Sequence, residues 1–112
     1  MTRFMVLYKS TASSAELMAT STPEQMQAVM DAWMAWAQKC GDALVDLGSP
    51  LQPAKKVAGG AVSDSSSRIA GFSVLQGESA DDVTALLVEH PHFMSPGEPS
   101  LVVLEYLPVP GM

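Results

Sequence analysis

The sequence predicts an α+β fold in which a four-stranded antiparallel sheet carries two helices on one face. Three observations predict it: a helix with marked ends, a strand directly after that helix, and the order strand, helix, strand, strand, helix, strand. When the strand–helix–strand connections are right-handed, this order of elements gives the ferredoxin-like βαββαβ plait. The chain has 112 residues, 47% of them hydrophobic, so we expect a single domain, 1–112, with one core.

The segment Thr22–Gly41 is predicted to form the long helix of this fold. The Thr22 hydroxyl can cap the first turn, Pro23 fits a position that needs no N–H, and Gln25 completes a capping box. Gly41 supplies a left-handed end. Apolar residues recur every three or four positions and give the helix one apolar side: Met26, Val29, Met30, Trp33, Ala37 and Cys40. We expect this side to pack on the sheet.

The first half of the chain also supplies two strands. Phe4–Tyr8 is apolar throughout, which is typical of a strand with both faces covered. The polar segment Lys9–Ser21 is predicted to be a loop, with at most a short turn around Ala15–Met18. Ala43–Leu47 is predicted to be the strand after the long helix, and Gly48–Pro50 ends it.

The next segment, Leu51–Ser67, is rich in Pro, Gly and Ser. We expect a long loop that contains a weak hairpin. Arg68–Gln76 then returns to strand character, with Ala70, Phe72 and Val74 on one face and Ile69, Gly71, Ser73 and Leu75 on the other. Gly71 indicates a bulge or the close approach of another backbone.

A shorter helix and a last strand complete the order. Ser79 is predicted to cap this helix and His90, which precedes a proline, to end it. The apolar stripe between them is narrow and consists of Val83, Leu86 and Leu87. Leu101–Leu107 is predicted to be the last strand, apolar apart from Glu105, and residues 108–112 form a tail.

Helices on one face leave the other face of the sheet without a cover. The first and last strands place large apolar groups on both faces, and each such group left in water forgoes about 1.5–3 kcal/mol of burial. A second sheet from a second copy is the simplest cover. We therefore expect a homodimer packed sheet on sheet.

The composition excludes several classes of protein. The formal charge is -6, from 12 acidic and 6 basic residues, which disfavours nucleic acid as a partner. Cys40 is the only cysteine, so no internal disulfide can form, as in a reducing cytoplasm. The apolar run at the start is too short for a signal peptide or a membrane span. We expect a cytoplasmic protein with no membrane partner.

Several segments together resemble the YCII-related proteins, in particular the subgroup labelled with the DGPF domain. The resemblance covers nearly the whole chain and rests on the order and spacing of TPEQMQAVMDAWMAWAQKCGDALVDLGSPL, GGAVSD, HPHF and LPVPGM. It implies a dimeric α+β barrel, in agreement with the dimer expected from the apolar strands. The broader family is associated with a His–Asp pair, with no settled substrate, and with genes that neighbour transcription factors.

The resemblance extends to single positions around the turn after the long helix. Asp46, Gly48 and Pro50 match a VDxGNP-like turn, although Leu47 replaces a usual proline and Ser49 a usual asparagine.

Later elements of the family pattern also have counterparts. Lys55 and Val57 fit a basic-then-aliphatic element, and Pro91 and His92 fit a CPH element in which His90 replaces the cysteine. Distant family members carry a histidine on the first helix, but this chain has none there, so a mechanism that rests on that residue cannot be transferred.

The two histidines are the candidates for acid–base chemistry. A catalytic zinc ion needs three protein ligands, and no third histidine or second cysteine exists, so we expect no metal. His90 continues the apolar stripe of the second helix and can be a packing residue. His92 follows in a loop and can carry a proton, oriented by Asp46 or Glu105. The alternative is a loop histidine that bonds only to backbone.

Asp46 and Glu105 interrupt apolar strands. Such a carboxylate must be paired, protonated or exposed. Either one can line a pocket or face solvent at a strand end. Four further residues are candidates for ligand binding: Trp36, Ser49, Lys55 and His90. Of these, Trp36 can also be core and Lys55 an ordinary solvated lysine.

The sequence lacks a phosphate-binding loop, a GxGxxG motif, a GxSxG elbow and a CxxC pair, so we expect no cofactor. Three functions remain open. The first is binding of a small apolar or aromatic molecule between helices and sheet. The second is cofactor-free proton transfer by His92 with a carboxylate. The third is an accessory interaction domain linked to transcriptional regulation, which predicts an exposed apolar patch.

Overall fold

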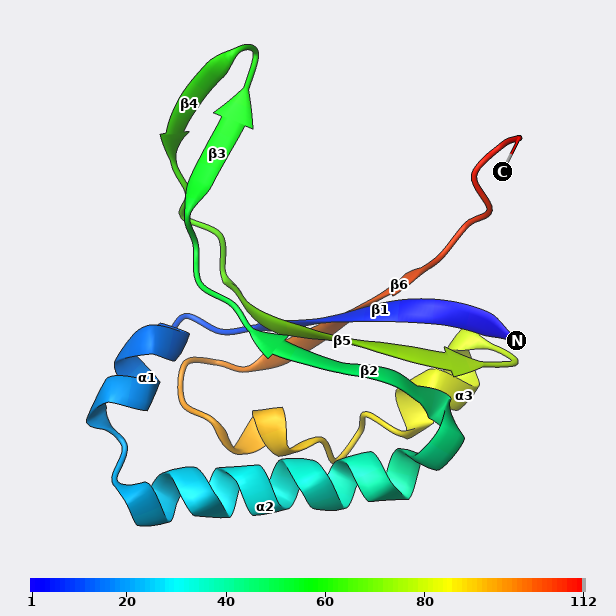
Figure 1. Ribbon diagram of the computed structural model, residues 1–112, viewed down its shortest axis with the longest axis horizontal. Helices are drawn as coiled ribbons and strands as arrows, with labels where there is room; N and C mark the ends of the chain where they lie inside the picture. Colours follow the sequence, from blue (N-terminus) through cyan, green and yellow to red (C-terminus); the bar gives the residue numbers. More distant parts are fainter. Residues whose placement is uncertain (112) are drawn as a thin grey trace.

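The computed structural model describes residues 1–111, and its sheet has the strand order of the ferredoxin-like plait (Figure 1). The four strands pair in the order β2-β5-β1-β6, and every pair is antiparallel. The elements are β1 (Thr2–Lys9), α1 (Ser14–Thr20), α2 (Pro23–Cys40), β2 (Leu44–Pro50), β3 (Lys55–Ala58), β4 (Ala61–Asp64), β5 (Ile69–Gly77), α3 (Ala80–Ala85) and β6 (Ser100–Glu105). Short 3-10 turns span Gly41–Ala43 and Pro91–Met94. The predicted fold class is confirmed.

The helices form one layer beneath the sheet (Figure 1). The predicted start of α2 is confirmed, because the Thr22 side chain accepts from the N–H of Gln25 and the Gln25 side chain accepts from the N–H of Thr22. Gly41 follows with a φ of 56°, and its N–H donates to the carbonyl of Ala37. The helix therefore begins and ends where its residues predict, although Gly41, with a ψ of -128°, does not adopt the expected left-handed helical conformation.

The two faces of the sheet differ in burial. Phe4, Val6 and Tyr8 of β1 point toward the helices and are buried. Their partners across β5 are Leu75, Ser73 and Gly71, which confirms the predicted division of that strand into two faces. This helix-side face carries the core, completed by Trp36, Cys40, Val83 and Leu87.

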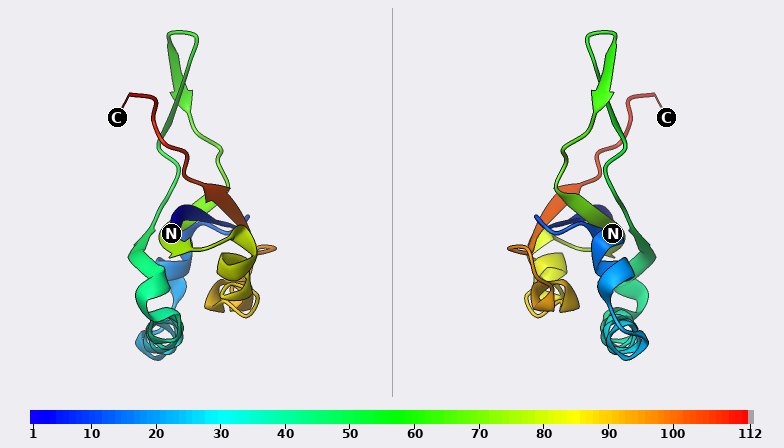
Figure 2. Two further views of the ribbon diagram at one scale, coloured as in Figure 1. Left: turned by 90° about the vertical axis from the view of Figure 1, so that its right-hand side faces the viewer. Right: turned by 90° about the vertical axis from the view of Figure 1, so that its left-hand side faces the viewer.

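The opposite face of the sheet, here the open face, is not covered by any helix. It carries apolar side chains from three strands: Met5, Leu7, Phe72, Val74, Val102 and Leu104. Figure 2 shows the β3–β4 hairpin and the C-terminal segment rising from the sheet on this side, away from the helices. The open face therefore lies between two projecting segments.

The N-terminal half of α2 departs from the expected packing. Residues 23–31 are all exposed, including Met26, Val29 and Met30, although these continue the apolar side that Trp33, Ala37 and Cys40 form further along. Only Trp36 and Cys40 of α2 are buried. The expectation that the whole apolar side packs on the sheet is therefore wrong for the first two turns.

Several boundaries differ from the prediction: β2 includes Gly48–Pro50, which was expected to end it, and α3 ends at Ala85 instead of His90. The loop predicted for Lys9–Ser21 contains α1, whose cap is Ser13. The weak hairpin is confirmed as β3 and β4, joined by Gly59 and Gly60, which both have positive φ as a two-residue hairpin turn requires. The last strand ends at Glu105 instead of Leu107, and Met112 of the predicted tail lies outside the described residues.

Two glycines allow close contact between β2 and β5. A Cβ on Gly71 would lie 3.1 Å from the carbonyl oxygen of Ser49, which confirms the predicted close approach. Gly48 has a φ of 84°, and a Cβ there would overlap the carbonyl oxygen of Phe72. Only glycine fits at position 48.

Candidate functional site

Two adjoining clefts open where the chain leaves β1 and β2. The larger, about 420 Å³, lies between α1 and the end of β2, and we call it the α1–β2 cleft. Its apolar walls come mainly from Met18, Pro50 and Leu51, and its polar groups from Ser14 and Ser49. It is therefore an open cleft whose surface is more apolar than polar.

The smaller cleft, about 270 Å³, lies between the segment after β1 and the segment before β5, and we call it the loop cleft. Serine and threonine hydroxyls and Arg68 line much of it, and its lining contains no acidic residue. The two clefts share Ser14 and Leu51. The two clefts therefore adjoin each other at these two residues.

Ser10 holds the floor of the loop cleft together. Its N–H donates to the carbonyl of Arg68 at 2.9 Å, and its hydroxyl lies 3.1 Å from the carbonyl oxygen of Pro96. The same hydroxyl accepts from the N–H of Ala12 at 3.0 Å. Gly97, with a φ of 92°, passes so close to Ser10 that a side chain would not fit. The floor is therefore a fixed backbone arrangement.

Helix α1 forms a wall of the α1–β2 cleft and buries none of its residues. Its attachment is polar: the Ser14 hydroxyl donates to the carbonyl of Ala70 on β5 at 2.9 Å. Leu51 donates its N–H to the same carbonyl at 2.8 Å. A seven-residue helix gains little stability from its own hydrogen bonds, so α1 depends on such contacts.

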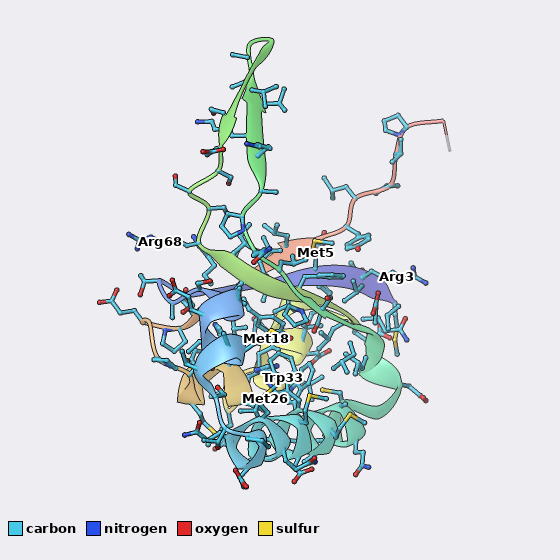
Figure 3. The ribbon with its side chains drawn as sticks, turned by 60° about the vertical axis from the view of Figure 1, so that its left-hand side comes forward. Arg3, Met5, Met18, Met26, Trp33 and Arg68 are labelled. Atoms are coloured by element: carbon cyan, nitrogen blue, oxygen red, sulfur yellow. The ribbon has the colours of Figure 1, made fainter. Side chains whose placement is uncertain are left out.

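A separate cluster of rings fills the interior between α2, β1 and the turn after α3. His90 lies at its centre, with ring centroids 4.3 Å from Trp36, 4.5 Å from Trp33 and 4.9 Å from Tyr8. His92 lies 5.3 Å from Tyr8. His90 is 1% exposed. Figure 3 shows Trp33 projecting from α2 toward this interior.

The protonation of His90 follows from its surroundings. The backbone N–H of His92 donates to Nδ1 of His90 at 2.9 Å, so the proton of the neutral ring is on Nε2. That Nε2 is buried and has no hydrogen-bond partner among residues 1–111. Burial, and next the positive charge that His92 can carry, lower the pKa of His90 to about 4. His90 is therefore neutral at pH 7.

Tyr8 belongs to the same interior. Its hydroxyl donates to the hydroxyl of Ser73 at 2.6 Å, which in turn donates to the carbonyl of Leu47 at 2.6 Å. Burial raises the pKa of Tyr8 to about 12, against the opposing effect of the Ser73 hydrogen bond. The chain of donors therefore ends on a backbone carbonyl.

The structure does not bring the three residues predicted for catalysis together. Nε2 of His92 lies 2.8 Å from the carbonyl oxygen of Lys9, and Oδ1 of Asp46 accepts from the N–H of Gly48 at 2.8 Å. Glu105 is exposed at the end of β6. Within residues 1–111, no hydrogen bond joins His92 to either carboxylate. The structure thus keeps the predicted partners apart in one chain.

The four residues predicted for ligand binding also lie in different parts of the structure. Ser49 lines the α1–β2 cleft. Trp36 is buried and donates from Nε1 to the carbonyl of Leu86 at 2.9 Å, and His90 is buried beside it. Lys55 lies on the exposed hairpin and pairs with Asp64 at 2.7 Å. Only Ser49 of the four reaches a cleft.

The sequence reasoning missed most of the cleft residues, among them Ser14, Met18, Leu51 and Arg68. One feature of the sequence does indicate the position of the loop cleft. Two hydroxyl-rich segments, at Ser10–Ser14 and Ser65–Ser67, flank predicted strands that pair in this fold, which places them at the same end of the sheet.

No metal or membrane site emerges from the described part of the chain. Residues 1–111 contain no group of three or more His, Cys, Asp or Glu side chains placed to bind a metal ion. Among the same residues, no helix combines the length and the hydrophobicity needed to cross a membrane.

The strand order and the helix layer define a ferredoxin-like α+β protein. No family model matches the sequence, and no curated protein is similar to it, so the YCII-related family stays a prediction from the motifs. One similar solved structure is 5-chloro-2-hydroxyhydroquinone dehydrochlorinase (TftG) from Burkholderia phenoliruptrix AC1100 in complex with 2,5-dihydroxybenzoquinone. It is 16% identical, with a TM-score of 0.49 over 94% of this chain and 93% of that chain. The strand order, and not this likeness, establishes the fold.

Proposed function

We propose that this protein binds a small apolar or aromatic molecule in the α1–β2 cleft. One observation carries the proposal: α1 buries none of its residues, yet it stands over a cleft of about 420 Å³ with apolar walls. Met18 lines this cleft and is 54% exposed. A bound apolar molecule would cover this side chain and stabilise a helix that is too short to be stable alone.

The polar groups of the cleft support the same function. Gln52 is exposed and can turn toward a ligand, while the hydroxyls of Ser14 and Ser49 already donate to the carbonyls of Ala70 and Pro50. Sites of this kind use apolar walls for affinity and a few polar groups for orientation. The cleft matches this division.

We further propose that the chain acts as a homodimer through the open face of its sheet, as a member of the YCII-related family. Leu7, Phe72 and Val102 are half-buried on that face, and no helix lies over them. A second copy would remove these side chains from water. The hairpin and the C-terminal segment, which project on the same side in Figure 2, would then flank the partner.

A second candidate function is protein interaction. The exposed residues Met26, Val29 and Met30 form an apolar patch on the helix layer, remote from the open face. A homodimer through the sheet would leave this patch free. Methionine-rich surfaces adapt to different partners, so the patch favours the accessory-domain alternative more than it favours catalysis.

The binding function can be tested by amide chemical shifts during titration with a panel of small aromatic compounds. We expect shifts to concentrate in residues 14–18 and 49–52, and Met18→Lys to abolish them. Met94→Lys is the matched control, because Met94 is 84% exposed and lines neither cleft. Shifts confined to other regions, or no binding by any compound, would contradict the proposal.

A further inference from the structure

We infer that the ligand is an amphiphilic monoanion: a small carboxylic acid with an aromatic or aliphatic body. The carboxylate would lie in the loop cleft beside Arg68, and the body in the α1–β2 cleft. This inference rests on the proposed function, because it names the chemical class of ligand for the same site.

The charge of the loop cleft is the first support. Arg68 is the charged residue of its lining, and no Asp or Glu lines it. The one ion pair among residues 1–111 joins Lys55 to Asp64, so Arg68 has no carboxylate partner there. Figure 3 shows Arg68 at the foot of the hairpin, on the rim of the body. A guanidinium binds a carboxylate through two parallel hydrogen bonds.

The hydroxyl groups of the loop cleft are the second support. The Ser13 hydroxyl accepts from the N–H of Glu16, and the Ser67 hydroxyl accepts from the N–H of Ile69. Both hydroxyl oxygens thus act as acceptors, which leaves their protons available to donate. Both residues line the cleft together with Arg68. A cleft with several donors and a cation suits an acceptor-only group such as a carboxylate.

The balance of charge favours one negative charge over two. A single cation compensates a monoanion, whereas a dianion would keep an uncompensated charge near a protein whose formal charge is -6. The adjoining α1–β2 cleft offers Met18, Pro50 and Leu51 to the rest of the ligand. An apolar body on a carboxylate therefore suits both clefts, whereas inorganic phosphate would leave the α1–β2 cleft empty.

The test compares matched ligands by calorimetric titration of the full chain at pH 7, with 2-naphthoate, its neutral amide 2-naphthamide and inorganic phosphate as probes. We expect 2-naphthoate to bind about ten-fold more tightly than 2-naphthamide. Arg68→Gln should remove this preference and leave the affinity for the amide unchanged. Arg3→Gln is the matched control, because Arg3 is exposed and lies on the opposite side of the molecule (Figure 3).

The outcomes separate this inference from the proposed function. Equal affinity for acid and amide, or a preference that survives Arg68→Gln, would overturn the carboxylate inference and leave small-molecule binding in place. Phosphate that displaces 2-naphthoate at similar concentration would show that the apolar body adds nothing to binding, and would overturn the assignment to an amphiphilic ligand. Failure of both naphthyl compounds to bind would contradict the inference. If, in addition, no compound of the aromatic panel shifted any amide signal, the proposed function would be refuted as well.

Discussion

The backbone N–H of His92 donates a 2.9 Å hydrogen bond to Nδ1 of His90. This bond caps the 3-10 turn Pro91–Met94 and determines which nitrogen of His90 carries the proton. The arrangement needs a neutral His90 ring, because a protonated Nδ1 cannot accept. Folding of this part of the chain is therefore linked to the protonation of one buried side chain.

The stability of the protein should depend on pH through His90. Its pKa is about 4 when folded, below the ordinary 6.5, so the unfolded chain binds the additional proton between these values. The contribution to stability is complete above pH 6.5 and is lost as the pH falls toward 4, with a limit of about 3 kcal/mol. Urea unfolding at several pH values measures this slope. His90→Asn, which keeps an acceptor for His92, should flatten it; an unchanged slope would assign the effect to other groups.

Gly48→Ala should destabilise the protein by about 3 kcal/mol, because it combines a strained backbone with overlap against Phe72. Thermal unfolding followed by circular dichroism measures the effect. Gly60→Ala is the control: Gly60 also has a positive φ, 80°, but a Cβ there meets open space. Its cost should be only about 1–2 kcal/mol. Equal losses of stability in the two variants would mean that the backbone at Phe72 can move away from the new side chain at little cost.

Tyr8→Phe should cost about 1 kcal/mol, because it removes a buried 2.6 Å hydrogen bond while Ser73 keeps its own bond to Leu47. Tyr106→Phe is the comparison, since Tyr106 is 43% exposed, and should change stability by less than about 0.5 kcal/mol. Chemical denaturation of both variants tests the difference. Similar values for the two would show that the Tyr8 bond contributes nothing.

Leu7→Lys should convert the proposed dimer into monomers, because it places a charge at the centre of the open face. Light scattering coupled to size exclusion measures the mass, which should be twice that of one chain before the change. Val88→Lys introduces the same charge at a position that is 73% exposed outside the sheet, and should leave the mass unchanged. A wild-type protein with the mass of one chain would refute the dimer directly.

Ser14→Ala should release α1 without unfolding the sheet, since Ser14 bonds α1 to Ala70 and α1 buries none of its residues. Hydrogen exchange should become faster in residues 17–20, and protection in β1 and β5 should remain. Ser63→Ala, on the exposed hairpin, should have no effect on α1. Loss of protection throughout the sheet would show that α1 is part of the core.

The sequence predicted the sheet and α2 well, because local chemistry determines them. The capping box at Thr22 and the alternation in β5 need no distant partner to be recognised. The packing of α2 was harder to predict, since Met26 and Trp33 share one apolar side, yet Met26 is 41% exposed. The clefts were missed because Ser14 is bonded to Ala70 across 56 residues of the chain. The periodicity of apolar residues cannot show contacts between residues so far apart in the chain.

The buried core and the cleft walls share no residue. The core consists of Phe4, Val6, Tyr8, Trp36, Cys40, Leu75, Val83 and Leu87, and none of them lines either cleft. Substitutions at Met18, Leu51 or Arg68 should therefore cost the fold little. The proposed ligand could therefore be exchanged by substitutions in the clefts alone, with the core and the architecture unchanged.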